Sequence, residues 1–225
     1  MNKRLKTAVL LSGGGSTFKN LLEKREQGRI PIDVELVVSS RLGAKGLEIA
    51  RDAGIRAEVV DPKGYSFNGR EAEILYDWGR MSREIDKLLL PEKFDLVCMA
   101  GYLSHYLIPE ELTGKVFNIH PSLVPMFCGQ GMYGMRVHRA VVASGVKLTG
   151  CTVHLVNNQY DAGPIVVQRS CPVYSEDTPE DVRRRVFKEE CIAYPHAINL
   201  FAEGRIRIIS NTRAFIRMKD GKDEA

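Results

Sequence analysis

Short apolar segments alternate with amphipathic segments through the first half of the chain, and this alternation restricts the fold more than any other feature. The apolar segments have the length and the β-branched content of buried strands, and the segments between them have the residue spacing of helices. Such an alternation is typical of βαβ units, in which parallel strands are covered by helices. The predicted strands are Thr7–Leu11, Val34–Val38, Ala57–Val60, Asp95–Ala100 and Lys115–Ile119.

The expected helices lie between these strands and carry apolar residues on one face. One helix follows Gly15, a second spans Leu42–Ala53, and a third is expected to run from about Asn68 to Leu90.

The pattern changes after His120, where a loop rich in glycine and aromatic residues follows. A short helix, two strand-like segments that predict an antiparallel extension, and a long capped helix come next, and the last residues are charged and expected to be loosely held. These segments are Pro121–Gly134 for the loop, Val137–Ala143, Leu148–Val156, Ile165–Val173, a helix from about Thr178 to Ala202, and the tail Asn211–Ala225.

The fold class predicted from these elements is α/β. We expect a Rossmann-like, open and mostly parallel sheet with helices on both faces and an antiparallel extension in the C-terminal half. The 225 residues contain no repeat, no low-complexity linker and no break in composition, so a single domain over residues 1–225 is expected.

Composition excludes several classes of protein. Lys and Arg total 32 against 28 Asp and Glu, and a net charge of +4 suits anionic small-molecule ligands but lacks the clustered positive face of a nucleic-acid binder. The 5 cysteines contain no CxxC pair, which argues against a disulfide framework or a zinc site and for reduced thiols in the cytoplasm. No apolar run reaches the roughly 20 residues of a membrane helix, and the apolar start Ala8–Leu11 is interpreted as a strand, not a signal peptide.

A glycine-rich turn, Ser12 to Thr17, lies between the first strand and the first helix. Backbone N–H groups at a helix N-terminus favour an anion, and glycines let a phosphate approach closely. The turn is neither G-x-G-x-x-G nor Walker A. It therefore predicts a phosphate site, with glycines used for packing alone as the alternative.

Asn118 and His120 end the fifth predicted strand and, two residues apart, point to the same side. The carboxyl edge of a parallel sheet is where α/β proteins bind ligands. Asp161, in a predicted turn before Gly163 and Pro164, becomes interesting if it meets His120, because a carboxylate favours the imidazolium and fixes its tautomer. Taken alone, a histidine at a strand end and an aspartate in a turn more often have structural roles.

The other histidines are interpreted as packed or exposed side chains, His138 and His196 on helices and His154 in a strand. No HExxH or comparable metal spacing occurs, so no metal is expected.

Together, these segments resemble the glycinamide ribonucleotide formyltransferase family, from Thr7 to about Ile209. The resemblance rests on the run Asn118–Leu123, followed by Asp161-x-Gly163-Pro164, and on the glycine-rich turn and Glu190-x-x-x-Tyr194-Pro195.

The resemblance implies transfer of a formyl group from 10-formyltetrahydrofolate, as cosubstrate, to the amine of glycinamide ribonucleotide in de novo purine biosynthesis. It implies a phosphate- and nucleotide-binding half up to about residue 110 and a catalytic and folate-binding half up to about residue 210. The residues that it implies are Asn118, His120 and Asp161 for catalysis, Gly14, Gly15, Ser16, Thr17 and Glu190 for the ribonucleotide, and Arg70, Leu103, Ser104, His105, Tyr106 and Asn118 for the folate.

Several alternatives stay open. A formyltetrahydrofolate deformylase uses the same trio with water as acceptor, and a related amino-sugar nucleotide could replace glycinamide ribonucleotide. A Rossmann-type oxidoreductase would need G-x-G-x-x-G, and a methionyl-tRNA formyltransferase would need an RNA-binding domain beyond Ile209, where only a short tail is expected. A non-catalytic binding module is the last option. Small molecules are the expected partners, with no nucleic acid and no membrane, for a monomer or a homodimer.

Overall fold

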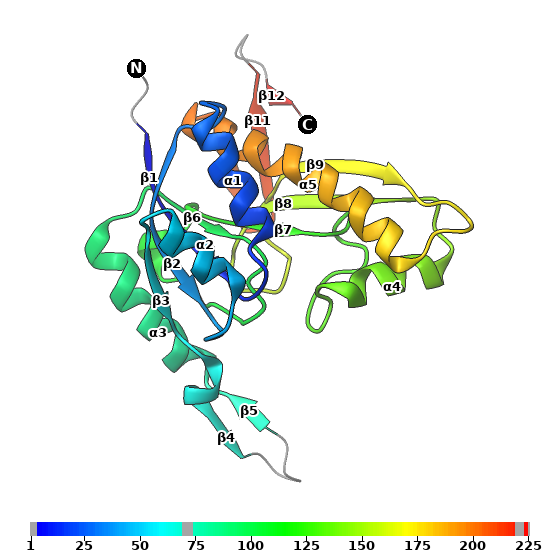
Figure 1. The fold of residues 1–225 in the computed structure, drawn as a ribbon. Helices are drawn as coiled ribbons and strands as arrows, with labels where there is room; N and C mark the ends of the chain where they lie inside the picture. The colour runs from blue at the N-terminus through cyan, green and yellow to red at the C-terminus, as the bar shows by residue number, and fades with distance from the viewer. Residues whose placement is uncertain (1–3, 69–73, 219–222, 225) are drawn as a thin grey trace. The chain divides into compact units, whose positions relative to one another are not determined.

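The computed structural model describes residues 4–68, 74–218 and 223–224 (Figure 1). Seven strands form a sheet in the order β3-β2-β1-β6-β7-β8-β9. Each strand lies within two residues of the range expected from the sequence, which confirms the α/β, Rossmann-like fold class. The strands are β1 (Leu5–Leu11), β2 (Ile32–Ser39), β3 (Arg56–Val59), β6 (Leu96–Met99), β7 (Val116–His120), β8 (Leu148–Leu155) and β9 (Ile165–Pro172).

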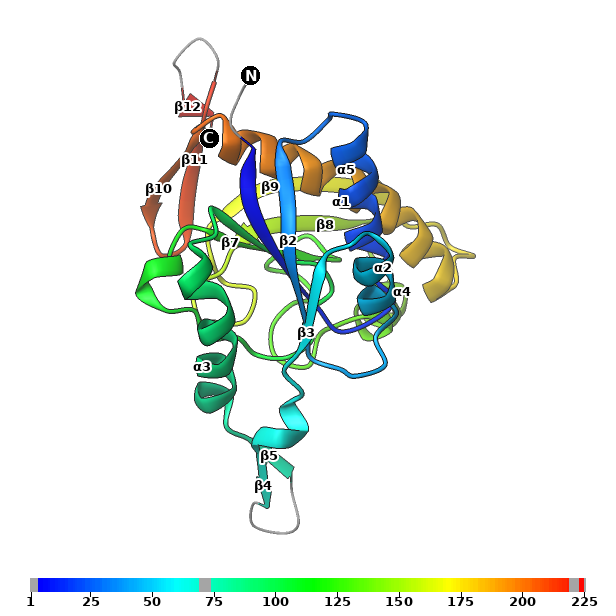
Figure 2. The same ribbon diagram turned by 60° about the vertical axis from the view of Figure 1, so that its left-hand side comes forward.

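The chain divides into two compact units, of which the first comprises residues 1–19 and 32–116. Its strands β1, β2, β3 and β6 pair in parallel, with β1 between β2 and β6. Figure 2 shows α2 (Lys45–Asp52) and α3 (Trp78–Leu89) on opposite sides of β2 and β3, as right-handed crossovers require when the strand order reverses. The residues Ala8 to Leu11 of β1 are fully buried and form the centre of this core.

The long helix expected from about Asn68 is wrong in its first part. The structure has a 3₁₀ turn, Pro62–Tyr65, and a hairpin of β4 (Ser66–Asn68) and β5 (Ile74–Tyr76) before α3 begins. Asp77 is the N-cap of α3, where its side chain accepts a hydrogen bond from the Arg80 amide, so the helix cannot extend back past it. Leu75 falls within the range expected for the helix, but it is 39% exposed on the hairpin. Arg70 lies outside the described residues.

The second unit comprises residues 20–31 and 117–225. In it β8 pairs antiparallel with both β7 and β9. Helix α5 (Pro179–Ala202) packs on β8 and β9, and α4 (Met135–Ser144) packs on α5 (Figure 1). The α5 N-terminus has the expected cap, a reciprocal capping box between Thr178 and Asp181. Helix α1 (Ser16–Glu26) has residues in both units.

The expectation that the tail is loosely held is wrong for much of its length. Residues Arg213–Arg217 form β11, which pairs antiparallel with β10 (Ile206–Ser210) and with β12 (Asp223–Glu224). The middle of β11 is half-buried, and backbone pairing together with this packing gives the charged segment a fixed place.

Candidate active site

The candidate site in the second unit is set by the register of β7 and β8. Asn118 on β7 lies directly opposite His154 on β8, and His120 follows two residues later on the same face. The Asn118 Nδ2 atom lies 3.2 Å from His154 Nε2 and 3.3 Å from Asp161 Oδ1. The His120 Nδ1 atom lies 3.4 Å from Asp161 Oδ2. The structure thus brings the three predicted catalytic side chains together.

Asp161 reaches this cluster because the turn after β8 is tightly built. Its backbone has φ 51°, in the left-handed region, where Asp is tolerated better than most residues. Gly163 passes so close to the Leu155 carbonyl oxygen that a Cβ would clash with it. The Leu155 amide donates to the Pro164 carbonyl at 2.9 Å. These backbone contacts place the carboxylate beside β7.

The loop after β7 also contacts the cluster, which the sequence did not indicate. The His120 Nε2 atom lies 2.9 Å from the carbonyl oxygen of Phe127, and the Gly129 amide donates to Asp161 Oδ2 at 2.9 Å. The Ser122 hydroxyl donates to the Met126 carbonyl at 2.6 Å and fixes the loop close to the strand end.

Burial and charge act in opposite directions on the titratable groups. Burial lowers the pKa of His120, against the opposing effects of Asp161 and the Phe127 carbonyl. Burial acts to raise the pKa of Asp161, but its contact with His154, the charge of His120 and the Gly129 amide together hold this pKa below its usual value. Asp161 is therefore a carboxylate at neutral pH. It favours the imidazolium as expected, but burial has the larger effect on His120.

The glycine-rich turn lies in the first unit between β1 and α1. Gly15 has φ 71°, and a Cβ there would lie 2.7 Å from the Cα of Gly46, so the turn requires glycine at this position. A Cβ at Gly14 would meet no atom within 4 Å. Gly14 and Ser16 are exposed and Thr17 is half-buried at the start of α1. The turn leaves backbone N–H groups accessible at a helix N-terminus.

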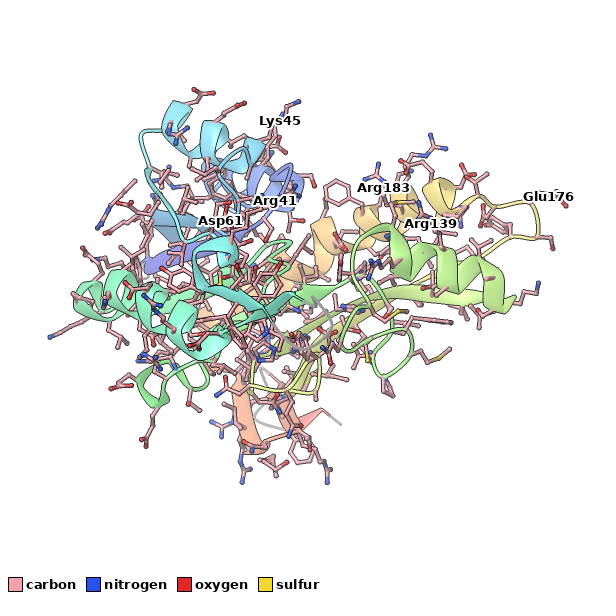
Figure 3. All side chains as sticks on the ribbon, turned by 90° about the horizontal axis from the view of Figure 1, so that it is seen from below. Arg41, Lys45, Asp61, Arg139, Glu176 and Arg183 are labelled. Atoms are coloured by element: carbon pink, nitrogen blue, oxygen red, sulfur yellow. The ribbon has the colours of Figure 1, made fainter. Side chains whose placement is uncertain are left out.

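Three hydrogen bonds hold this turn. The Ser12 hydroxyl lies 2.6 Å from the Ser40 hydroxyl and accepts a hydrogen bond from the Leu103 amide at 2.8 Å. The Gly46 amide donates to the Gly13 carbonyl. Arg41 and Lys45, which the sequence analysis did not single out, extend from the segment just before Gly46 (Figure 3). They add positive charge to the part of the chain that contacts the turn.

The segment Leu103–Tyr106, expected to contact folate, lies in the first unit as well. Leu103 is 46% exposed, and the His105 ring lies 6.5 Å from that of Trp78. Tyr106 is buried, and its hydroxyl donates to Asp86 on α3 at 2.7 Å. The Tyr106 side chain thus anchors the segment to α3.

Glu190 lies on α5, one turn before Tyr194, whose hydroxyl donates to the Phe117 carbonyl on β7. Burial raises the pKa of Glu190 to about 7, against the opposing charge of Arg183. Arg183 extends from α5, and Arg139 from the neighbouring helix α4 (Figure 3). A carboxyl group with this pKa can exchange hydrogen bonds with hydroxyl groups in either protonation state.

His138 is buried, as expected, and burial lowers its pKa to about 4. His154 is also packed, as expected, and in addition it contacts two of the three predicted catalytic side chains. The register that places it opposite Asn118 could have been obtained only by pairing the two strands correctly.

Within residues 4–68, 74–218 and 223–224, no group of three or more His, Cys, Asp or Glu side chains is arranged to hold a metal ion. None of the helices in these ranges is long and apolar enough to cross a membrane.

The sequence profile of the formyl transferase family matches residues 5–198. The chain belongs to the formyl transferase family. This confirms the resemblance seen in the sequence motifs.

Among relatives of this formyl transferase, the chloroplastic phosphoribosylglycinamide formyltransferase of Arabidopsis thaliana is 38% identical over 226 residues, which cover 99% of this chain and 74% of that protein. The crystal structure of glycinamide ribonucleotide transformylase 1 from Symbiobacterium toebii has a TM-score of 0.80 and 40% identity, covering 95% of this chain and 94% of that chain. A formyltetrahydrofolate deformylase from Pseudomonas putida has a TM-score of 0.76 and 27% identity, covering 96% of this chain and 71% of that chain.

Proposed function

We propose that this formyl transferase moves the formyl group of 10-formyltetrahydrofolate to the amine of glycinamide ribonucleotide, a step of de novo purine biosynthesis. The names and the identity of its relatives support the choice of substrates. The observation that carries the proposal is the contact network of Asn118, His120 and Asp161, because it combines hydrogen-bond donors with a negative charge beside an imidazole.

In the first step, the amine attacks the formyl carbon, and the carbonyl oxygen becomes an oxyanion of a tetrahedral intermediate. Asn118 Nδ2 and protonated His120 donate hydrogen bonds to this oxygen, and each such donor is typically worth about 2.7–4 kcal/mol. In the described state His120 Nε2 faces the Phe127 carbonyl. The oxyanion replaces that carbonyl as the acceptor during the reaction.

In the second step, the bond between the formyl carbon and the folate nitrogen breaks, and the nitrogen takes up a proton while the former amine loses one. Asp161 keeps His120 oriented through the 3.4 Å contact and favours its cationic form against the larger effect of burial, and the carboxylate assists the proton transfer directly or through water. General acid–base catalysis of this kind contributes about 10²–10⁴-fold.

The remaining residues have binding roles in this proposal. Backbone N–H groups of Gly14 and Gly15 with the hydroxyl groups of Ser16 and Thr17 bind the ribonucleotide phosphate, since the turn at the start of α1 suits an anion. The Glu190 carboxyl group binds the ribose hydroxyls. The segment that follows Gly101 contacts the folate.

Partners other than small molecules are not part of the proposal. The cysteines of the described residues are free thiols, which suits the reducing cytoplasm as the site of action.

The similarity to a deformylase gives the second candidate, because hydrolysis needs the same trio with water in place of the amine. The deciding experiment incubates the full chain with 10-formyltetrahydrofolate, with and without glycinamide ribonucleotide. We expect formylated ribonucleotide only when both are present. Release of formate without the ribonucleotide would indicate the deformylase, and absence of both products would contradict either activity. Replacing glycinamide ribonucleotide with an amino-sugar nucleotide tests the acceptor.

A further inference from the structure

His154 is a buried histidine next to the proposed catalytic residues, and the mechanism above assigns no role to it. Its side chain is 2% exposed, and it lies on β8 opposite Asn118. Both ring nitrogens have polar neighbours at short distance. These neighbours determine which ring nitrogen carries the proton.

The His154 Nδ1 atom lies 2.9 Å from the Leu155 carbonyl oxygen. A carbonyl oxygen only accepts hydrogen bonds, so Nδ1 must carry the proton. In the neutral ring the other nitrogen, Nε2, is then an acceptor without a proton. His154 therefore presents a lone pair to Asn118.

The Asn118 amide has two acceptors on one side. The same atom of Asn118 lies 3.2 Å from His154 Nε2 and 3.3 Å from an oxygen of the Asp161 carboxylate. Because two acceptors face it, this atom is the amide nitrogen, with one N–H directed at each neighbour. The covalent geometry then places the amide oxygen on the opposite side.

The other forms of His154 would disrupt this arrangement. A proton on Nε2 would face the NH₂ group of Asn118, and the amide would have to turn over to avoid two opposed donors. After that turn, its oxygen would face the Asp161 carboxylate, which is unfavourable. The Nδ1–H tautomer is compatible with both contacts of Asn118. His154 Nε2 also lies 3.6 Å from Asp161 Oδ1, which is too long for a hydrogen bond that would hold a proton on Nε2.

We propose that His154 is a positioning residue that fixes the amide of Asn118 with its NH₂ group available as a donor. This inference rests on the proposed function, since it concerns the donor that meets the oxyanion. One N–H is held by His154, and the oxyanion replaces the Asp161 carboxylate as the acceptor of the second. His154 is 2% exposed and acts through Asn118.

The first test needs no activity. Nitrogen-15 NMR of the wild-type chain reports the tautomer of each histidine, and a His154→Gln variant identifies the signals of this ring. We expect Nδ1 protonated and Nε2 unprotonated at neutral pH. An Nε2–H tautomer, or a mixture of the two, would overturn the proposal even if the chain is an active formyltransferase.

The second test compares two variants that differ in the length of the side chain. The amide of His154→Asn superposes on the Nδ1 side of the ring and keeps only the Leu155 contact, whereas His154→Gln places an amide oxygen near the position of Nε2 and can still accept from Asn118. We expect kcat to fall about 100-fold in His154→Asn, with both KM values nearly unchanged, and to be largely restored in His154→Gln. Equal loss in the two variants, or a loss that appears in KM, would contradict positioning through Asn118.

A double-mutant cycle completes the test. In an Asn118→Ala background the amide is absent, so His154→Asn should cause no further loss of kcat. Losses that multiply would show that His154 acts by another route. Lack of formyl transfer in the wild type would refute the proposed function. The NMR result for the tautomer would still show whether His154 accepts a hydrogen bond from Asn118.

Discussion

The two candidate sites of this chain are built in different ways. The glycine-rich turn of the first unit is a backbone site, where Gly15 has φ 71° and no side chain can be added without a close contact to Gly46. The cluster of the second unit is a side-chain site, in which Asn118, His154 and Asp161 come from two strands and a turn. The first depends on local conformation, and the second depends on strand register.

This difference predicts different responses to mutation. At the backbone site a substitution changes the path of the chain, so it should affect stability and binding together. In the side-chain cluster a substitution leaves the antiparallel backbone in place, so it should affect chemistry much more than binding.

The largest effect is expected for His120→Ala. The variant loses an oxyanion donor and the proton carrier of the cluster, and kcat should fall about 10³-fold or more. Binding of glycinamide ribonucleotide, measured by calorimetry, should be preserved because the proposed phosphate ligands are in another segment. A near-normal kcat would mean that the catalytic trio is wrongly assigned.

Glu190→Gln should change the pH dependence of stability. The pKa of Glu190 is about 7 in the folded protein, above its ordinary value of 4.5, so the wild type loses stability as pH rises between these values. Removal of the titration should make the variant more stable than the wild type at pH 8, by up to about 3 kcal/mol, and equal to it at pH 4. Denaturant unfolding of both proteins at pH 4 and pH 8 provides the measurement. The same difference in free energy of unfolding between wild type and variant at both pH values would contradict the raised pKa of Glu190.

Gly15→Ala should destabilise the protein by about 1–3 kcal/mol and raise KM for the ribonucleotide, since alanine is strained at this φ and its Cβ meets Gly46. Gly13→Ala is the matched control, because a Cβ there meets no atom within 4 Å. Thermal unfolding of the pair compares them directly. Equal stability of the two variants would remove the argument that the backbone path defines this site.

The smallest effect is expected for the pKa of His120 in Asp161→Asn. The carboxylate raises this pKa while burial, the larger cause, lowers it, so loss of the charge should lower the pKa further. An NMR titration of His120 in the wild type and in the variant measures the change. An unchanged pKa of His120 would show that the charge of Asp161 does not act on this ring.

The sequence predicted the fold where the signal is local. Apolar runs such as Ala8–Leu11 indicate strands and the Thr178 cap indicates a helix start in any context, and the strands and α5 were found close to their expected ranges. The start of α3 was missed because Leu75 has an apolar side chain that is exposed on a hairpin, and hydrophobic periodicity cannot distinguish that case.

The candidate site could be predicted from the sequence only where motifs mark its residues. Asn118 and His120 share a strand, so their common face follows from a spacing of two residues. The pairing of Asn118 with His154 follows from an antiparallel register between distant segments, and the role of the loop at Phe127 depends on a left-handed backbone at a non-glycine residue. Neither the register nor this backbone conformation can be predicted from the spacing of residues in the sequence.

The loop from Phe127 to Gly129 offers an acceptor to His120 and a donor to Asp161. The loop carbonyl and amide stabilise the pair when the His120 ring is positive and the Asp161 carboxyl group is negative. They destabilise the neutral form, in which the proton has moved from the ring to the carboxyl group. Loop docking and charge separation are consequently linked: each stabilises the other by the same free energy. A reporter of loop position would therefore also follow the protonation of the pair.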